Sequence, residues 1–546
     1  MKLKRIVTTF LAAMSVLLVA GCGATADIPK GPNYRESNSN SHSFEAYAYS
    51  SVSDGMAEMN GLDWYCGESF ITLEQFKYLK ECGFTAIMPQ STAVAGTAVL
   101  DDVLRLALQA GLKVIITDNR IYQGTSETPM MVYNTLYNSE AALDQAVKGW
   151  LDDYWDHPAY WGVMFDDEPG NAILNGSYGD LYKSVRRVYD NNGHSDKFIF
   201  ANTMAMSTWS GYTEHGENPE RWTEISNEKY CEILGDEFTT NAAKFANDQE
   251  GFWNYVNEYV SAAGGMRDEY QCGIMRARFE AFMRTYFEKT GADHVAIDWY
   301  PLYSSGPMTH MIASLQIASM VANEFNAELH VVSQTMTYVP YGSTSERLYT
   351  EEDMRFVNDM MLGFGVKEIS YFTYFVHGDD NKGYFLEQSS FMTWYGEKTQ
   401  LWYIMQKIMA DNQKFANTIK NFQYQTSRMY KKQVSGYGDA LEYIDYGKDM
   451  GNFKVLRSVE TDQSSAVVTE LYDAKKKNYM YMIQNVVDSQ WRTADTYQTA
   501  TLTFTDKYDY AVIWVNGETK EVALKDHQLV VENPAGQATF IIPYAG

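Results

Sequence analysis

The sequence predicts an α/β fold, a (β/α)8 barrel followed by a C-terminal all-β sandwich. Short apolar runs typical of strands alternate with amphipathic helical patterns eight times over residues 44–420. Over residues 421–546 the pattern changes to alternating strands with turn residues such as Asn516-Gly517. The length of 546 residues also exceeds one ordinary core, because domains hold about 100–200 residues and barrels somewhat more.

Composition narrows the possible functions. Hydrophobic residues make up 45% and charged residues 21% of the chain, which is typical of globular proteins and excludes wholesale disorder. Asp and Glu number 70 against 44 Lys and Arg, which gives a net charge of −26. Because such a surface repels phosphate backbones, nucleic acid is not an expected partner. Composition does not fix an oligomeric state.

The N-terminus has the features of an export sequence. Basic side chains precede an apolar run over residues 6–20, which suits a signal peptide and is too short for a membrane span. The run ends in Val19-Ala20-Gly21-Cys22, which resembles the bacterial lipobox. We therefore expect a signal peptide over residues 1–22, lipidation of Cys22 and a membrane lipid anchor at the bacterial cell surface. The polar residues 23–43 are expected to form a flexible linker.

The barrel is expected to contain eight strands, each followed by a helix. The predicted strands are Phe44–Tyr49, Phe84–Met88, Lys113–Thr117, Tyr160–Phe165, Phe198–Ala201, Val295–Ile297, Leu329–Val332 and Ile369–Phe372. The predicted helices cover residues 72–82, 101–110, 141–154, 180–189, 274–287, 311–325, 354–362 and 401–415. The first helix opens with Thr72 and Gln75 in capping-box spacing and stops at Gly83. An insertion rich in Trp, Tyr and Glu follows the fifth strand over residues 204–272.

Common cofactor and metal motifs do not occur in the sequence. No Gly-x-Gly-x-x-Gly follows the first strand and no Gly-Lys-Ser/Thr loop occurs, which argues against a nucleotide-binding sheet. Cys66, Cys82, Cys231 and Cys272 show no C-x-x-C spacing, so a zinc site is not expected, and their disulfide state stays open. We expect neither a metal nor an organic cofactor.

An acidic cluster at the end of the fourth strand is the strongest candidate for chemistry. In a (β/α)8 barrel the active site lies at the carboxyl ends of the strands. There the fourth strand reads Phe165-Asp166-Asp167-Glu168-Pro169. Three adjacent carboxylates repel one another and raise the pKa of at least one of them, as a general acid working near neutral pH requires. An acidic loop or helix cap is the structural alternative.

A second acidic residue, Asp298, follows the sixth strand beside Trp299 and Tyr300. Two strands along a barrel wall correspond to about 10 Å between backbones, and inward side chains shorten that distance to the span of two carboxyl groups around a glycosidic bond. Asp298 is therefore the predicted partner of Glu168. A structural carboxylate that accepts hydrogen bonds from loop amides is the alternative.

Other polar and aromatic residues at strand ends fit a carbohydrate, whose hydroxyls form hydrogen bonds while its C–H faces stack on rings. The predicted substrate-binding residues are Asp118, Asn202, Trp299, Tyr300, Gln334 and Tyr374. Core packing is the alternative for each aromatic ring among them.

The motif His157-Pro158-Ala159-Tyr160-Trp161-Gly162, leading into Asp167-Glu168-Pro169, resembles the fourth-strand region of exported TIM-barrel glycoside hydrolases. The resemblance implies hydrolysis of an oligo- or polysaccharide, with Glu168 at the position of an acid/base. Gln334 stands where the large clan with two catalytic glutamates has its nucleophile. The second catalytic residue is therefore open between Asp298, Asp166 and Asp167.

Chitinases and hexosaminidases offer a second resemblance, because in them an Asp before the fourth-strand Glu steadies the substrate acetamido group. While the strand continues, Asp166 and Glu168 share one face and Asp167 points away, so Asp166 is the expected inward partner. Tyr300 resembles the sixth-strand Tyr of the chitinases. The predicted function is a cell-surface glycoside hydrolase. The alternatives are substrate-assisted hydrolysis of N-acetylated sugars and a catalytically silent glycan-binding lipoprotein.

Overall fold

The computed structural model describes residues 31, 45–49, 56–59, 62–65, 70–89, 98–118, 139–204, 225–263, 269–302, 308–336, 348–375, 390–393, 395–430, 453–462, 465–486 and 497–546. The predicted signal peptide, Cys22 and nearly all of the predicted linker lie outside the described residues. Among the described helices, none combines the length and the apolar content needed to cross a membrane. Cys82 and Cys231 are free thiols.

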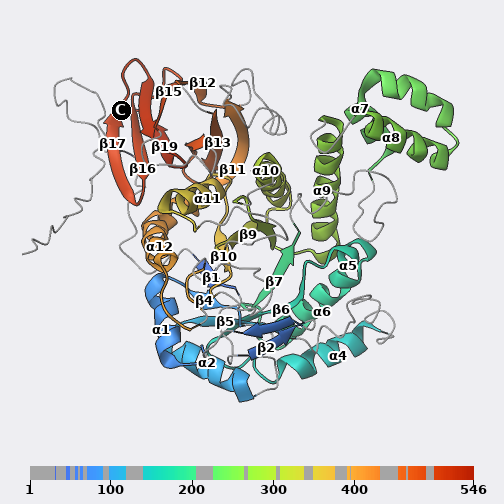
Figure 1. The fold of residues 1–546 in the computed structure, drawn as a ribbon, viewed down its shortest axis with the longest axis vertical. Coiled ribbons are helices and arrows are strands. Elements are labelled where there is room, and N and C mark those ends of the chain that lie inside the picture. Colours follow the sequence, from blue (N-terminus) through green and yellow to red (C-terminus); the bar gives the residue numbers. More distant parts are fainter. Residues whose placement is uncertain are drawn as a thin grey trace, which may run out of the picture.

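Eight parallel strands close into a barrel, which confirms the predicted fold class (Figure 1). They follow one another around the wall in the order β1-β10-β9-β8-β7-β6-β5-β4. Their bounds lie within two residues of the predicted ones: β1 Glu45–Ala48, β4 Ala86–Ile87, β5 Lys113–Thr117, β6 Tyr160–Asp167, β7 Phe198–Thr203, β8 His294–Trp299, β9 Glu328–Gln334 and β10 Glu368–Phe372. A separate hairpin pairs β2 (Met56–Met59) with β3 (Leu62–Tyr65).

Helices cover the outside of the barrel. They are α1 Leu73–Cys82, α2 Ala98–Ala110, α4 Glu140–Leu151, α5 Gly170–Asn175, α6 Ser177–Asn191, α9 Glu269–Thr290, α10 Met308–Glu324, α11 Glu351–Gly363 and α12 Gln400–Ile419. The bounds of α1 are set as predicted, because the Thr72 hydroxyl accepts a hydrogen bond from the Gln75 amide at 3.3 Å and Gly83 ends the helix with φ 116°. The reciprocal bond of a capping box does not form, because the Gln75 side chain donates to the Gly396 carbonyl.

Side chains alternate across the barrel wall. On β7, Ile199 and Ala201 pack beneath the helices, whereas Phe200 points into the barrel. The interior is filled by side chains from several strands, among them Tyr47, Met88, Ile115, Met164, Phe200, Ala296 and Val332. Because the interior is packed, a site must lie at the carboxyl ends of the strands.

The predicted insertion contains a helical arm, formed by α7 (Asn227–Ala242), a short 3-10 helix (Ala243–Phe245) and α8 (Gln249–Ala263). The arm stands away from the barrel, at the upper right of Figure 1. It buries an apolar cluster of its own, made of Tyr230, Leu234, Phe238, Phe252, Val256 and Val260 together with Ile274 of α9. The core of the arm is therefore separate from that of the barrel.

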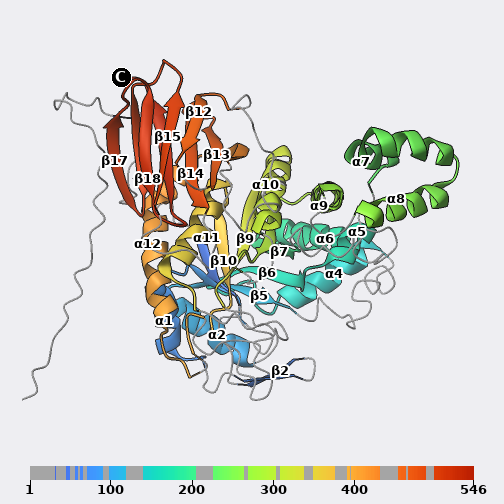
Figure 2. The same ribbon diagram turned by 45° about the horizontal axis from the view of Figure 1, so that its top comes forward.

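The C-terminal part is a β-sandwich that packs on the barrel helices (Figure 2). A six-stranded sheet in the order β11-β13-β14-β19-β16-β17 faces a three-stranded sheet in the order β12-β15-β18. The strands are β11 Gln423–Tyr430, β12 Leu456–Thr461, β13 Ser465–Asp473, β14 Asn478–Val486, β15 Gln498–Phe504, β16 Tyr510–Val515, β17 Glu518–Ala523, β18 Gln528–Asn533 and β19 Ala538–Tyr544. On β14, Tyr481 and Ile483 enter the core between the sheets, while Met480 and Met482 join the barrel core.

Candidate active site

A β-bulge in β6 decides which acids face the barrel axis. Met164 pairs with Phe200 of β7, but Asp167 pairs with Asn202, so β6 has one residue more than β7 over this stretch. The extra residue reverses the alternation of inward and outward side chains along β6, so Asp167 points toward the barrel axis. The expectation that Asp166 faces inward is therefore wrong, because it assumed a regular strand.

Asp167, Asn202 and Asp298 form one hydrogen-bonded group across three neighbouring strands. Asn202 Nδ2 donates to Asp167 Oδ1 at 2.9 Å and to Asp298 Oδ1 at 3.1 Å. The Tyr300 hydroxyl donates to the same oxygen of Asp298 at 2.9 Å. The Tyr49 hydroxyl, which follows β1, donates to Met164 Sδ at 3.7 Å and lies close enough to Asp167 and Asp298 for their charges to raise its pKa. Four barrel strands thus supply one polar cluster.

Glu168 lies directly after β6, in a strained backbone conformation. Its φ of 50° falls in the left-handed region. This region is uncommon for a residue with a side chain, costs on the order of 1–3 kcal/mol, and is found preferentially at functional sites. The Glu168 amide donates to the Asn202 carbonyl at 3.2 Å, which ties the strained residue to β7. The carboxyl group is hydrogen-bonded to Asp298, so the two predicted catalytic acids are in contact.

Burial and mutual repulsion raise the pKa values of the acids. The pKa of Asp298 lies well above its usual range, first because of burial and then because of the hydrogen bond and the charge of Glu168. Burial raises the pKa of Asp166 to about 7 and that of Asp167 to about 6. Near neutral pH the cluster therefore retains a dissociable proton, which general acid catalysis requires.

The members of the cluster differ in their exposure to solvent. Asn202 and Asp298 are buried, with 2% and 9% of their surface exposed. Asp166 and Glu168 are half-buried, whereas Asp167 as a whole residue is exposed although its carboxyl is desolvated where it meets Asn202. A ligand at this end of the barrel would therefore meet Asp166, Asp167 and Glu168 first. Asn202 and Asp298 are the more buried members of the cluster.

Three other predicted substrate-binding residues lie outside this cluster. Asp118 is fully buried and accepts a hydrogen bond from the Tyr154 hydroxyl at 2.8 Å. Trp299 packs into the core beneath the helices, because its neighbour Asp298 faces inward. Tyr374 is fully buried among aromatic rings. These placements favour structural roles for all three.

Gln334 lies inside the rim, but its amide is fully engaged. Its Oε1 accepts from the Leu302 amide at 3.1 Å, and its Nε2 donates to the Met336 carbonyl at 3.3 Å and to the Tyr349 hydroxyl. Gln334 therefore holds together the segments that follow β8 and β9.

Tyr49 is the cluster member that sequence reasoning missed. It lies two residues after Tyr47, whose side chain fills the barrel interior, so the period of the first strand places it on the same inward face. The part of the chain that the structure describes contains no group of three or more His, Cys, Asp or Glu side chains arranged to hold a metal ion.

Solved structures that are similar to this chain in fold include three glycoside hydrolases. A β-L-arabinopyranosidase of glycoside hydrolase family 27 from Geobacillus stearothermophilus is 11% identical, with 92% of this chain and 97% of that chain covered and a TM-score of 0.45. A family 5 glycoside hydrolase from Bacteroides vulgatus is 9% identical, with 92% and 89% covered and a TM-score of 0.43. A family 39 glycoside hydrolase from Bacteroides cellulosilyticus is 10% identical, with 92% and 81% covered and a TM-score of 0.41. No family model and no curated protein matches the chain.

Proposed function

We propose that the protein is a glycoside hydrolase, held at the bacterial cell surface through Cys22, that cleaves an oligo- or polysaccharide with Glu168 as its general acid. One observation carries the proposal: at the carboxyl end of the barrel, the strained and accessible Glu168 contacts the buried Asp298. A buried carboxyl in contact with an accessible one keeps a proton near neutral pH, as a glycosidic oxygen requires.

In the proposed reaction, Glu168 donates its proton to the glycosidic oxygen, which takes the electron pair of the breaking bond to the anomeric carbon. Positive charge then develops on the sugar ring. Asp167 supplies compensating negative charge, because its pKa is about 6 and the hydrogen bond from Asn202 favours its ionised form. Water adds to the anomeric carbon, and its proton returns to the acid pair.

Substrate-assisted hydrolysis of an N-acetylated sugar is a second candidate, and the contacts of Asp298 favour it. Asp298 Oδ1 accepts two hydrogen bonds, and the carboxyl also bonds Glu168, so this group is poorly placed to attack a sugar. In that mechanism the acetamido group of the substrate is the nucleophile. Asp167, which faces inward beside Glu168, would orient its N–H.

The experiment is a cleavage assay of purified protein on matched neutral and N-acetylated oligosaccharides, with products separated by chromatography. Glu168→Gln keeps the shape of the side chain but has no proton to give, so we expect a loss of about 10²- to 10⁴-fold in kcat with binding retained. The matched control is Glu140→Gln, because the Glu140 side chain on α4 is 85% exposed and pairs with Arg187 and not with the acid cluster.

Three possible results distinguish the proposed function from its alternatives. Cleavage of N-acetylated chains alone selects the substrate-assisted candidate. Binding without any cleavage by the wild type selects the glycan-binding alternative. Full activity in Glu168→Gln removes Glu168 from the mechanism.

A further inference from the structure

The amide of Asn202 lies between two acids that come from different strands, and both of its hydrogens are used. Nδ2 donates to Oδ1 of Asp167 and to Oδ1 of Asp298, at 2.9 and 3.1 Å. The amide oxygen is buried and has no hydrogen-bond partner within the part of the chain that the structure describes. The opposite orientation of the amide would turn this oxygen toward both carboxyl oxygens, which repel it unless both acids are protonated. The NH2 group of Asn202 therefore faces the two acids, and its oxygen is left without a hydrogen bond from the described residues.

The same contacts assign the proton of Asp298 to one of its two oxygens. Oδ1 accepts hydrogen bonds from Asn202 and from the Tyr300 hydroxyl. A carboxyl oxygen that carries a proton is a poor acceptor for two donors, so a proton on Asp298 would be placed on Oδ2. Oδ2 is then the oxygen that remains for the hydrogen bond to Glu168.

We propose that Asn202 is a positioning residue, which holds the proton shared by Asp298 and Glu168 on the side of Asp298 that faces Glu168. The catalytic meaning of this inference rests on the proposed glycosidase function. When Glu168 gives its proton to the glycosidic oxygen, the bond from that oxygen to the anomeric carbon breaks and leaves its electron pair on the oxygen. Both acids are then carboxylates, until the water that adds to the anomeric carbon returns one proton to the pair. Asn202 acts through the acids and does not touch the sugar.

Groups from four strands face the acid pair and set its titration. They are Tyr49 after β1, Asp167 on β6, Asn202 on β7 and Tyr300 after β8. The hydrogen bonds from Asn202 lower the pKa of Asp167 and that of Asp298, against the effect of burial. Loss of the Asn202 amide must therefore raise both values further.

The test is the pH–rate profile of Asn202→Leu, which keeps the volume of the side chain and removes both donors. Because the pair then loses its proton at higher pH, we expect the alkaline limb of kcat/KM to move up by about one pH unit. Asn202→Ser is smaller and keeps one hydroxyl donor, so it should fold and shift the limb less. Thr203→Val is the matched control: the Thr203 hydroxyl is also buried, but it donates to the Ala296 carbonyl and not to an acid. It should leave the profile unchanged.

A second measurement does not depend on activity. Infrared difference spectra of the full chain, recorded from pH 5 to 9, follow the protonated carboxyl band, and Asp298→Asn assigns the part that belongs to Asp298. In Asn202→Leu this band should persist to higher pH than in the wild type. An unshifted band, or activity lost equally at every pH, would overturn the positioning role. A shifted band in a protein that cleaves no glycoside would instead remove the proposed function and leave the role of Asn202 in proton placement intact.

Discussion

At the scale of single residues, Asp298 shows how the site couples activity to stability. Its carboxyl is buried among Asn202, Tyr300 and two other acids, and its pKa is raised well above the usual range. The folded protein therefore binds a proton there that the unfolded chain releases at a pH of about 4. The protonated Asp298 carboxyl therefore contributes fully to the stability of the fold below that pH. This contribution is lost as the pH rises toward the folded pKa of Asp298.

We therefore expect Asp298→Asn to stabilise the protein at alkaline pH while lowering its activity. The Asn Oδ1 can still accept from Asn202 and Tyr300, and its Nδ2 offers Glu168 a donor where the proton was. Thermal unfolding should show a rise in Tm on the order of 2 °C at pH 8 and a smaller rise at pH 5. Turnover should fall about 10²-fold.

Asp298→Ala, which leaves a cavity, is the contrasting variant and should lower Tm at both pH values. A lower Tm of Asp298→Asn at pH 8 than at pH 5, each relative to wild type, would contradict this account.

The candidate acids could be predicted from the sequence because Glu168 and Asp298 each follow an apolar strand, and strand ends converge in a barrel. Their partners were harder to predict. Whether Asp166 or Asp167 faces inward depends on the bulge in β6, and a bulge is visible only in the register with the neighbouring strand. For Asp118 the difficulty was the direction of the side chain. Its buried carboxyl accepts a hydrogen bond from Tyr154, outside the barrel interior.

At the scale of elements, the barrel strands can be predicted because each is a short apolar run. For the helical arm, the sequence analysis predicts an insertion but no helices. The arm nevertheless carries a helical period, since Tyr230, Leu234 and Phe238 are spaced four residues apart and share one buried face. That pattern was obscured by Gly235, where φ is 86° and the geometry of α7 is interrupted.

The separate core of the arm predicts that it can unfold alone. Phe238 is fully buried and its ring contacts Phe252, Tyr255 and Tyr259, so Phe238→Ala should cost about 3–5 kcal/mol of local stability. Hydrogen exchange should show lost protection over α7 and α8, with β7 and β8 still protected. Thr240→Ala, at an exposed position of the same helix, should change stability by no more than about 0.5 kcal/mol. Equal loss of protection in the barrel strands would show that the arm and barrel unfold as one unit.

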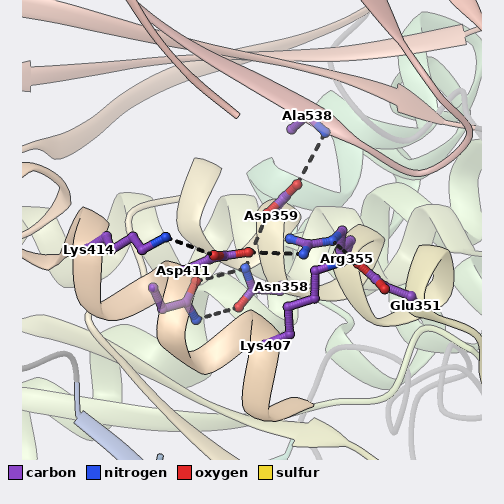
Figure 3. Close-up of polar contacts among 9 residues, drawn as sticks. Glu351, Arg355, Asn358, Asp359, Lys407, Asp411, Lys414 and Ala538 are labelled. Atoms are coloured by element: carbon purple, nitrogen blue, oxygen red, sulfur yellow. Dashed lines mark hydrogen bonds and ion pairs between the residues drawn. The ribbon is translucent and has the colours of Figure 1, made fainter. Parts of the chain in front are cut away.

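At the scale of the whole molecule, a buried polar network joins the barrel to the sandwich (Figure 3). Arg355 of α11 is 6% exposed and pairs with Glu351 at 2.9 Å and with Asp411 of α12 at 3.0 Å. Asp359 accepts a hydrogen bond from the Ala538 amide of β19 at 3.2 Å. The sequence predicted the sandwich strands from their alternation, but it could not predict this junction, because its members come from three segments far apart along the chain.

Arg355 is expected to be the residue on which this junction depends. Burial raises the pKa of Asp359 to about 6 and also raises that of Asp411, while the Arg355 charge lowers both. In Arg355→Met the two carboxyls lose this cation, and we expect a destabilisation of about 3–5 kcal/mol in urea unfolding. The sign of the pH dependence follows from the raised pKa values. The carboxyls are protonated and tolerated at low pH, and their contribution is lost as the pH rises through 6, so the loss should be larger at pH 8 than at pH 5.

Lys414→Met removes a half-exposed partner of Asp411 at 3.8 Å and should cost no more than about 1 kcal/mol at either pH. A loss in Arg355→Met that is the same at both pH values would mean that packing, and not the uncompensated carboxyls, holds the sandwich on the barrel.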